Sequence, residues 1–274
     1  MRSTSRVCAA GVDVRVLVRD GAKARPLQAT GAEVVLGDLD RPETLEPAIA
    51  GVAKVYLLTW NGPTQAQQVH DLVRAAKRVG SPHIVRHSMW GSPRSRIIAQ
   101  GEQAEAEIAS SGLPWTMLKP TFFMQNTMMA APTIANDGVI YWDMKDGRLG
   151  MIDVRDIVDV AVSVLTGDGH EGQSYVLTGP AAISFHDVAA TFSAILGREI
   201  TYVPVSGEAS LQSMIGMGFP EWISRGFVEL SEGFSEGFAS ETTGNVAMLT
   251  GHPARPFEQF ARDFAGAFRS AAVA

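Results

Sequence analysis

Short runs rich in Val, Ile and Leu alternate with helical segments through the first half of the chain. The runs have the apolar pattern of strands, and the segments between them have helix-capping residues or one apolar face. Because a strand, a helix and a further strand form a parallel unit, this order predicts an α/β fold with a mostly parallel sheet and helices on both faces. The predicted strands are residues 13–19, 33–36, 54–59, 83–87 and 114–119, and the predicted helices are residues 40–51, 65–79 and 102–111.

The second half of the chain is mostly helical. A helix over 154–165 and a short strand over 174–177 predict that residues 151–180 return to the sheet. Residues 199–204 are predicted to be extended, and the pattern from Glu208 onward is helical and rich in Met and Phe. We therefore expect a sheet-forming part at residues 1–126 and a smaller, mostly helical part at residues 127–274.

Two helix starts are predicted from capping residues. Asp40 is expected to cap the helix that follows it, with Pro42 in the first turn. Ser184 and Asp187 have the spacing of a capping box and predict a helix that ends at Gly197.

Composition excludes several classes of protein. The 23 basic and 29 acidic residues give a net charge of −6, which does not indicate a nucleic-acid surface. The single cysteine, Cys8, excludes an internal disulfide framework, and the six histidines do not have metal-ligand spacing. No apolar run has the length of a membrane helix, and the first residues lack the apolar core of a signal peptide. We expect a cytoplasmic protein that has no metal site and binds neither nucleic acid nor membrane directly.

Ligands of parallel α/β sheets bind beyond the carboxyl ends of the strands. The residues that follow the predicted strands are therefore the candidates for a functional site. They are residues 19–20, 37–39, 59–62, 88–91 and 120–126.

Several of these stretches resemble one family. Residues 112–126 (GLPWTMLKPTFFMQN) and 174–184 (SYVLTGPAAIS), with residues 56–59 and Gly37–Asp38, are similar to the NmrA-like atypical short-chain dehydrogenase/reductases, which include triphenylmethane reductase and NADPH-dependent quinone reductases. The resemblance implies a Rossmann-like fold, with dinucleotide binding by residues 1–126 and a substrate or lid region at 127–274. It also implies NADP as the cofactor.

The given sequence does not contain the element with which members of this family begin. Members of the family begin with a strand, a glycine-rich turn and a helix, whereas only ten residues precede Gly11 here. That turn presents backbone N–H groups to the cofactor pyrophosphate, so we expect NADP binding by this N-terminally truncated chain to be impaired. A start codon placed too late, a true truncation, and a fold that has abandoned the cofactor remain three alternatives.

The resemblance assigns cofactor contacts residue by residue. Arg19 would face the adenosine 2′-phosphate and favour NADP, unless it is an ordinary surface arginine. Asp38 would lie near the adenine amino group, unless it caps the next helix. The remaining cofactor candidates are Leu39, Leu58, Thr59, Pro120 and Phe122.

Catalytic and substrate residues are less well defined. Ordinary short-chain dehydrogenases use a Ser with a Tyr-x-x-x-Lys pair. Ser88 is the candidate hydroxyl here, but the expected helix has Gln100, which does not titrate, where a base might stand. Asn126 is a second candidate, as a hydrogen-bond donor to a substrate oxygen. An apolar pocket for a planar substrate would be lined by Trp60, Trp90, Phe123, Met124 and Trp142, unless these aromatic residues belong to the core.

Three functions are consistent with these residues. The first is an NAD(P)H-dependent oxidoreductase of a small aromatic or quinone-like substrate. The second is a non-catalytic NADP(H)-binding redox-sensing regulator, and the third is a non-redox isomerase or lyase on a decayed Rossmann fold. The Met- and Phe-rich residues 214–238 are a protein surface, a homodimer interface or core.

Overall fold

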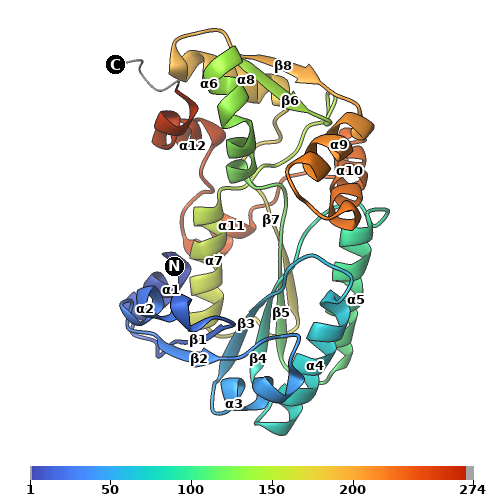
Figure 1. Ribbon diagram of the computed structural model, residues 1–274. Coiled ribbons are helices and arrows are strands. Elements are labelled where there is room, and N and C mark those ends of the chain that lie inside the picture. The colour runs from blue at the N-terminus through green and yellow to red at the C-terminus, as the bar shows by residue number, and fades with distance from the viewer. Residues whose placement is uncertain (1, 270–274) are drawn as a thin grey trace. The chain divides into compact units, whose positions relative to one another are not determined.

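Parallel strands followed by helices build the first of two units. The computed structural model describes residues 2–269 (Figure 1). Unit 1 comprises Met1–Ser88, Gln100–Leu118 and Val158–Tyr175, and unit 2 comprises Met89–Ala99, Lys119–Ile157 and Val176–Ala274. Residues 158–175 thus return to the sheet-forming unit, whereas residues 89–99 and 119–126 group with the second unit rather than with the first part expected from the sequence.

The strands that the sequence predicts to form one parallel sheet form two. Strands β1 (Arg15–Val18) and β2 (Glu33–Leu36) pair in parallel, and a four-stranded sheet has the order β3-β4-β5-β7. Within residues 2–269, no strand joins β1 to β3. The four strands of the larger sheet are β3 (Lys54–Leu58), β4 (His83–His87), β5 (Trp115–Pro120) and β7 (Gln173–Leu177).

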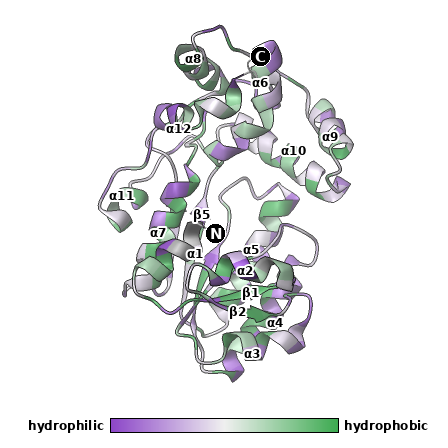
Figure 2. Ribbon diagram, turned by 60° about the vertical axis from the view of Figure 1, so that its left-hand side comes forward, coloured by the Kyte–Doolittle hydropathy of each residue, from purple (hydrophilic) through white to green (hydrophobic). Residues whose placement is uncertain are grey.

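Helices cover both faces of the four-stranded sheet, as predicted. The apolar face of α4 (Gln65–Arg78) and part of α5 (Arg96–Ser110) pack with strand residues such as Leu57 and Ile84 in one core. Helix α7 (Val154–Thr166) lies against the other face, where Lys54 Nζ donates to the Val164 carbonyl. The apolar residues of β1, β2 and α4 are green in Figure 2. The remaining helices of unit 1 are α1 (Arg2–Ala9), α2 (Ala24–Gln28) and α3 (Leu45–Ile49), with short 3₁₀ turns at Gly21–Lys23 and Pro42–Thr44.

One predicted cap is wrong. Asp40 does not cap the turn that begins at Pro42, because Arg41 occupies the N-cap position and makes no side-chain bond there. The Asp40 carboxylate instead accepts a hydrogen bond from Gln68 Nε2 at 2.7 Å. The long-range partner outcompetes the local one, which sequence spacing alone does not reveal.

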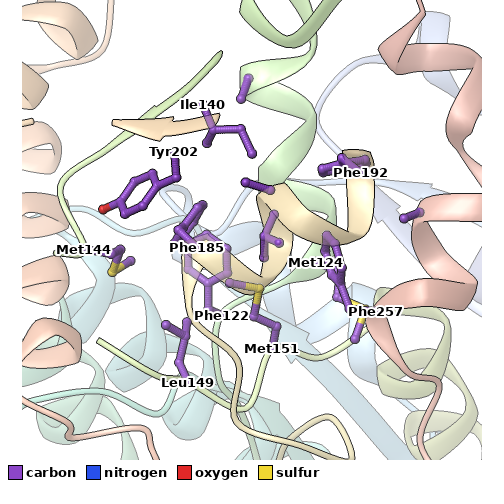
Figure 3. Packing of buried hydrophobic residues seen from close by; sticks show 14 of the residues in the cluster. Phe122, Met124, Ile140, Met144, Leu149, Met151, Phe185, Phe192, Tyr202 and Phe257 are labelled. Carbon is purple, nitrogen blue, oxygen red and sulfur yellow. The ribbon is translucent and has the colours of Figure 1, made fainter. Parts of the chain in front are cut away.

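Unit 2 is built around an aromatic core (Figure 3). Ser184 and Asp187 form the predicted capping box and start α8 (Phe185–Leu196), whose Phe192 is fully buried against Phe257 and Phe268. The parallel pair β6 (Val139–Trp142) and β8 (Thr201–Pro204) lies beside α8. The other helices are α6 (Ala131–Asp137), α9 (Gly207–Gly216), α10 (Glu221–Ser235), α11 (Asn245–Thr250) and α12 (Phe257–Asp263), with 3₁₀ helices at Met124–Ala130 and Ala265–Phe268.

The described residues contain neither a candidate membrane span nor a cluster of metal ligands. None of their helices combines the length and the apolar character needed to cross a bilayer. Nor do three or more His, Cys, Asp or Glu side chains among them gather with the geometry of a metal site.

Gly179 tests the packing behind β7. A Cβ at this position would lie 2.0 Å from the Met151 carbonyl oxygen, so the backbone must move in Gly179→Ala. We expect this variant to lose about 2 kcal/mol or more of the free energy of unfolding in urea denaturation. Gly216→Ala, at the end of α9 with open space around it, is the control and should be neutral or stabilise by up to about 1 kcal/mol. Equal losses in the two variants would contradict the close packing.

Candidate functional site

The carboxyl end of β1 presents a cation to solvent. Arg19 is exposed, and its guanidinium has no hydrogen-bond or ion-pair partner within residues 2–269. The neighbouring Asp20 carboxylate accepts the Ala22 N–H at 2.8 Å with one of its oxygens, as the N-cap of a 3₁₀ turn. This edge therefore offers a positive group to which an anion can bind.

The carboxyl end of β2 is a tight turn with an exposed apolar residue. A Cβ on Gly37 would lie 2.6 Å from Leu17 Cδ1, so a larger residue here would require the Leu17 side chain to move. Asp38 Oδ1 accepts the Asp40 N–H at 3.1 Å, so the Asp38 carboxylate shapes the turn with one of its oxygens. Leu39 is half-buried and packs against the core. Leu36 is 67% exposed. The sequence does not reveal this, because the apolar strand pattern around Leu36 predicts a core position.

The carboxyl end of β3 holds large apolar side chains on a fixed backbone. Leu58 and Trp60 are 59% and 73% exposed, while Thr59 between them is buried. The buried amide of Gln65 donates to Thr59 Oγ1 at 2.9 Å and to the Trp60 carbonyl at 3.4 Å. These bonds hold the backbone, so the Trp60 indole extends into solvent from a well-defined position.

The carboxyl end of β4 holds a cluster of titratable groups that the sequence analysis did not identify. His87 Nδ1 lies 2.5 Å from the Tyr56 hydroxyl of the neighbouring strand, and Arg86 is 1% exposed. Burial, assisted by the Arg86 charge, lowers the pKa of His87 to about 4, and burial raises the pKa of Tyr56. Burial also lowers the pKa of Arg86 to about 10, which leaves this group charged at neutral pH. The end of β4 thus combines a buried cation, a neutral imidazole and a neutral phenol.

Ser88 follows this cluster and is bound by α5. Its hydroxyl donates a hydrogen bond to the Glu105 carboxylate. Gly101 lies one helical turn before Glu105, and a Cβ there would be 3.8 Å from Ser88 Oγ. Short-chain dehydrogenase spacing points to Gln100 as the position of an acid or base and does not indicate Glu105, although the helical period places Glu105 on the same face as Gly101.

In unit 2, the segment from Phe122 to Asn126 is held by the residues that precede α7. The Met124 N–H donates to the Ile152 carbonyl at 2.8 Å, and Gln125 Nε2 donates to Asp153 Oδ1 at 2.9 Å. Asp153 is fully buried. Although burial alone would raise the pKa of Asp153, the hydrogen bonds from Arg155 outweigh that effect and hold it low. The segment is therefore fixed by an ionised carboxylate and by backbone pairing.

The predicted pocket residues of unit 2 have two kinds of surroundings. Phe122 and Trp142 pack edge to face at 5.6 Å, and Phe122 and Met124 are 8% and 1% exposed, so these side chains serve the core (Figure 3). Trp90 is half-buried and contacts the partly exposed Phe238, with ring centroids 5.5 Å apart. Lys119 Nζ lies 5.3 Å from the Trp90 ring centroid. Phe238 was not identified from the sequence, because it comes from a turn far along the chain.

The sequence-predicted residues are divided between the two units, and their roles stay predictions. Arg19, Asp38, Leu39, Leu58, Thr59, Trp60 and Ser88 belong to unit 1. Pro120, Phe122, Phe123, Met124, Asn126, Trp90 and Trp142 belong to unit 2, where Phe123 and Asn126 are half-buried.

The parallel strands, the helices on both faces and the polar groups at the carboxyl ends define an α/β protein of the Rossmann-like class. Within that class, the chain belongs to the NmrA-like family, whose model matches residues 3–247. This confirms the family expected from residues 112–126 and 174–184.

Individual relatives are oxidoreductases. The chain is 40% identical to an NAD(P)H azoreductase from Xenophilus azovorans over 94% of this chain and 91% of the relative. It is 28% identical to quinone oxidoreductase 2 from Escherichia coli (strain K12) over 86% of this chain and 84% of the relative. The solved structure of an NADPH-dependent quinone oxidoreductase from Escherichia coli, complexed with NADPH, has the same fold, with a TM-score of 0.88 and 24% identity over 96% of this chain and 95% of that chain.

The lowered pKa of His87 has a consequence for stability. The unfolded chain binds a proton at His87 below about pH 6.5, whereas the folded protein does so only near pH 4. The free energy of unfolding therefore falls as the pH drops through this window, by at most about 3 kcal/mol from this group. We expect His87→Gln to lack this contribution, so the stability difference between wild type and variant should change between pH 7 and pH 4 in urea denaturation. A pH-independent difference would contradict the burial of a neutral imidazole.

Proposed function

We propose that this protein is an NADPH-dependent reductase of planar aromatic acceptors of the quinone or azo-dye type. The observation that carries the proposal is the 40% identity to an azoreductase along nearly the whole chain. The quinone oxidoreductase relative supports the same reaction class. The bound cofactor would supply a hydride, and the protein's own residues would bind and orient both partners.

The residues present fit the adenosine end of NADPH. The Arg19 guanidinium, which has no partner within residues 2–269, matches a 2′-phosphate. In this proposal Asp38 and Leu39 flank the adenine. Leu58, Thr59, Pro120 and Phe122 are the further cofactor contacts that we propose. We assign no residue to the diphosphate, because no strand among residues 2–269 leads through a glycine-rich turn into a helix.

The acceptor side of the proposal rests on aromatic surface. Trp90 and Phe238 form a partly exposed pair beside Lys119, and aromatic faces bind planar rings by stacking. Trp60 offers a second exposed indole. We propose Trp90 and Phe238 as the main acceptor contacts, and we propose Asn126 as a hydrogen-bonding group for an acceptor oxygen.

Arg19→Ala tests the cofactor assignment. Removing the guanidinium should weaken NADPH binding about tenfold or more and leave NADH binding within about twofold, because only NADPH has the 2′-phosphate. Fluorescence titration of both nucleotides measures the two dissociation constants. Arg74→Ala, which removes an exposed arginine of α4, is the control and should change neither constant. Equal weakening of both nucleotides in Arg19→Ala would contradict the role of Arg19.

Trp90→Ala tests the acceptor assignment. Loss of the stacking surface should raise KM for a naphthoquinone or azo acceptor about tenfold and leave KM for NADPH unchanged, with Trp90→Phe intermediate. Met248→Ala removes an exposed apolar side chain elsewhere in unit 2 and should change neither constant.

Oxidation of NADPH by a panel of quinones and azo compounds tests the reaction class. Tight NADPH binding without oxidation by any quinone or azo compound would overturn the reductase and favour a nucleotide-binding regulator.

A further inference from the structure

Glu105 decides which hydrogen bonds Ser88 can make with a ligand. The Ser88 hydroxyl donates to the Glu105 carboxylate, and the hydroxyl has no other partner within residues 2–269. A hydroxyl has one proton and two lone pairs, whereas a carboxylate only accepts. Because the proton is used toward Glu105, Ser88 Oγ faces a ligand as an acceptor. It is therefore not the donor that polarises a substrate carbonyl in ordinary short-chain dehydrogenases.

The space beside Ser88 Oγ is open. Outside α5's own backbone and the adjacent residues, a Cβ on Gly101 would have only Ser88 Oγ within 4 Å, at 3.8 Å. By contrast, close packing explains Gly226, where a Cβ would lie 2.5 Å from Ile97 Cγ1. Glycine inside a helix costs stability, and no packing within residues 2–269 requires it at Gly101. Ser88 and Gly101 are both half-buried, so the space between them is accessible to a ligand.

This open space lies at the carboxyl ends of two neighbouring strands. Ser88 directly follows β4. The loop after β3 reaches the same part of α5, because Gln100 Nε2 donates to the Pro63 carbonyl at 3.2 Å. All of these residues belong to unit 1. Since ligands of parallel α/β sheets bind beyond the carboxyl ends of the strands, Ser88 Oγ is an acceptor at the expected ligand edge.

An acceptor requires a donor on the ligand. Quinone oxygens and azo nitrogens carry no hydrogen, so neither group matches Ser88 Oγ. NADPH has donors in its adenine amino group, its ribose hydroxyls and its nicotinamide carboxamide. In the proposed function the adenosine end meets residues that follow β1 and β2, which form a different sheet from β4. The nicotinamide half of the cofactor is therefore the part that matches Ser88.

We propose that Ser88 Oγ accepts a hydrogen bond from the carboxamide N–H of the bound nicotinamide cofactor, and that Glu105 is a positioning residue that acts through Ser88. A contact at the carboxamide restricts rotation of the nicotinamide ring and so orients the carbon that gives up the hydride. The inference rests on the NADPH binding of the proposed function.

Two nucleotides that differ at one group test this contact. In the 3-acetylpyridine analogue of NADP⁺ a methyl group replaces the carboxamide NH₂, so the analogue keeps the carbonyl and lacks the donor. Isothermal titration calorimetry should show that Ser88→Ala weakens binding of NADP⁺ about tenfold and binding of the analogue less than about twofold. Equal weakening of the two nucleotides, or an unchanged dissociation constant for NADP⁺, overturns the carboxamide contact.

Ser110 offers a matched control on the same helix. The Ser110 hydroxyl is exposed and bonds only to backbone carbonyls of α5. Ser110→Ala should leave both dissociation constants unchanged. A loss of NADP⁺ affinity equal to that of Ser88→Ala would contradict a specific role of Ser88.

Variants of Glu105 test the positioning role. Glu105→Leu removes the acceptor of the Ser88 proton, so the preference for NADP⁺ over the analogue should fall about fivefold. Glu105→Gln keeps an oxygen that accepts this proton and should restore most of the preference. Damage to the fold alone would weaken both nucleotides equally. An unchanged preference in Glu105→Leu removes the positioning role.

Gly101→Ala tests the open space. Alanine favours a helix more than glycine does, and the added methyl meets no protein atom closer than Ser88 Oγ, so the urea midpoint should rise. The methyl occupies space that the ligand would use, so the dissociation constant of NADP⁺ should rise about fivefold. Opposite changes in stability and affinity separate a ligand contact from damage to the fold, and unchanged affinity overturns the assigned space.

Failure of the proposed function gives a different result from failure of this contact. If the wild type binds neither nucleotide, both proposals fall. If the wild type binds NADP⁺ with the preference that Arg19 provides, and Ser88→Ala binds it equally well, only the Ser88 contact is removed.

Discussion

Parallel pairing of β3 with β4 is the interaction on which the candidate site depends. The register places Tyr56 opposite Val85 and Leu58 opposite His87, so Tyr56 and His87 lie on one face and two positions apart along the strands. A phenol reaches that distance, and the hydrogen bond forms. Alternation along β4 sends Arg86 to the opposite face of the sheet, the face covered by α5, which carries Glu105. A slip of one residue would exchange the two faces and dismantle the cluster.

Burying polar groups at this end of the sheet costs folding free energy. Arg86 lacks a full set of acceptors, and Tyr56 and His87 satisfy each other. Groups of this kind persist where the surrounding packing fixes them, and they leave the site ready before a ligand arrives. In unit 2 the segment from Phe122 to Asn126 is fixed in the same manner, because Gln125 is bonded to the buried carboxylate of Asp153.

Local patterns predicted the elements well and the polar contacts poorly. The strands at 33–36 and 83–87 and the capping box of Ser184 match the structure because they depend on residues next to one another in sequence. The Asp40 cap failed because its partner, Gln68, is 28 residues away. Leu36 has the pattern of a core residue but ends its strand in solvent, since burial depends on what covers the strand.

The amino-acid sequence by itself determined the order of strands and helices, the Rossmann-like class and the NmrA-like family, because periodicity, caps and the stretch at 112–126 are properties of neighbouring residues. Only the tertiary structure decided that Tyr56 meets His87, that Ser88 meets Glu105, and that Phe238 meets Trp90. The members of such pairs are 17 or more residues apart, and strand register and helix packing bring them together. No local pattern encodes those contacts, and for that reason the polar cluster at the end of β4 emerged from the fold rather than from the sequence.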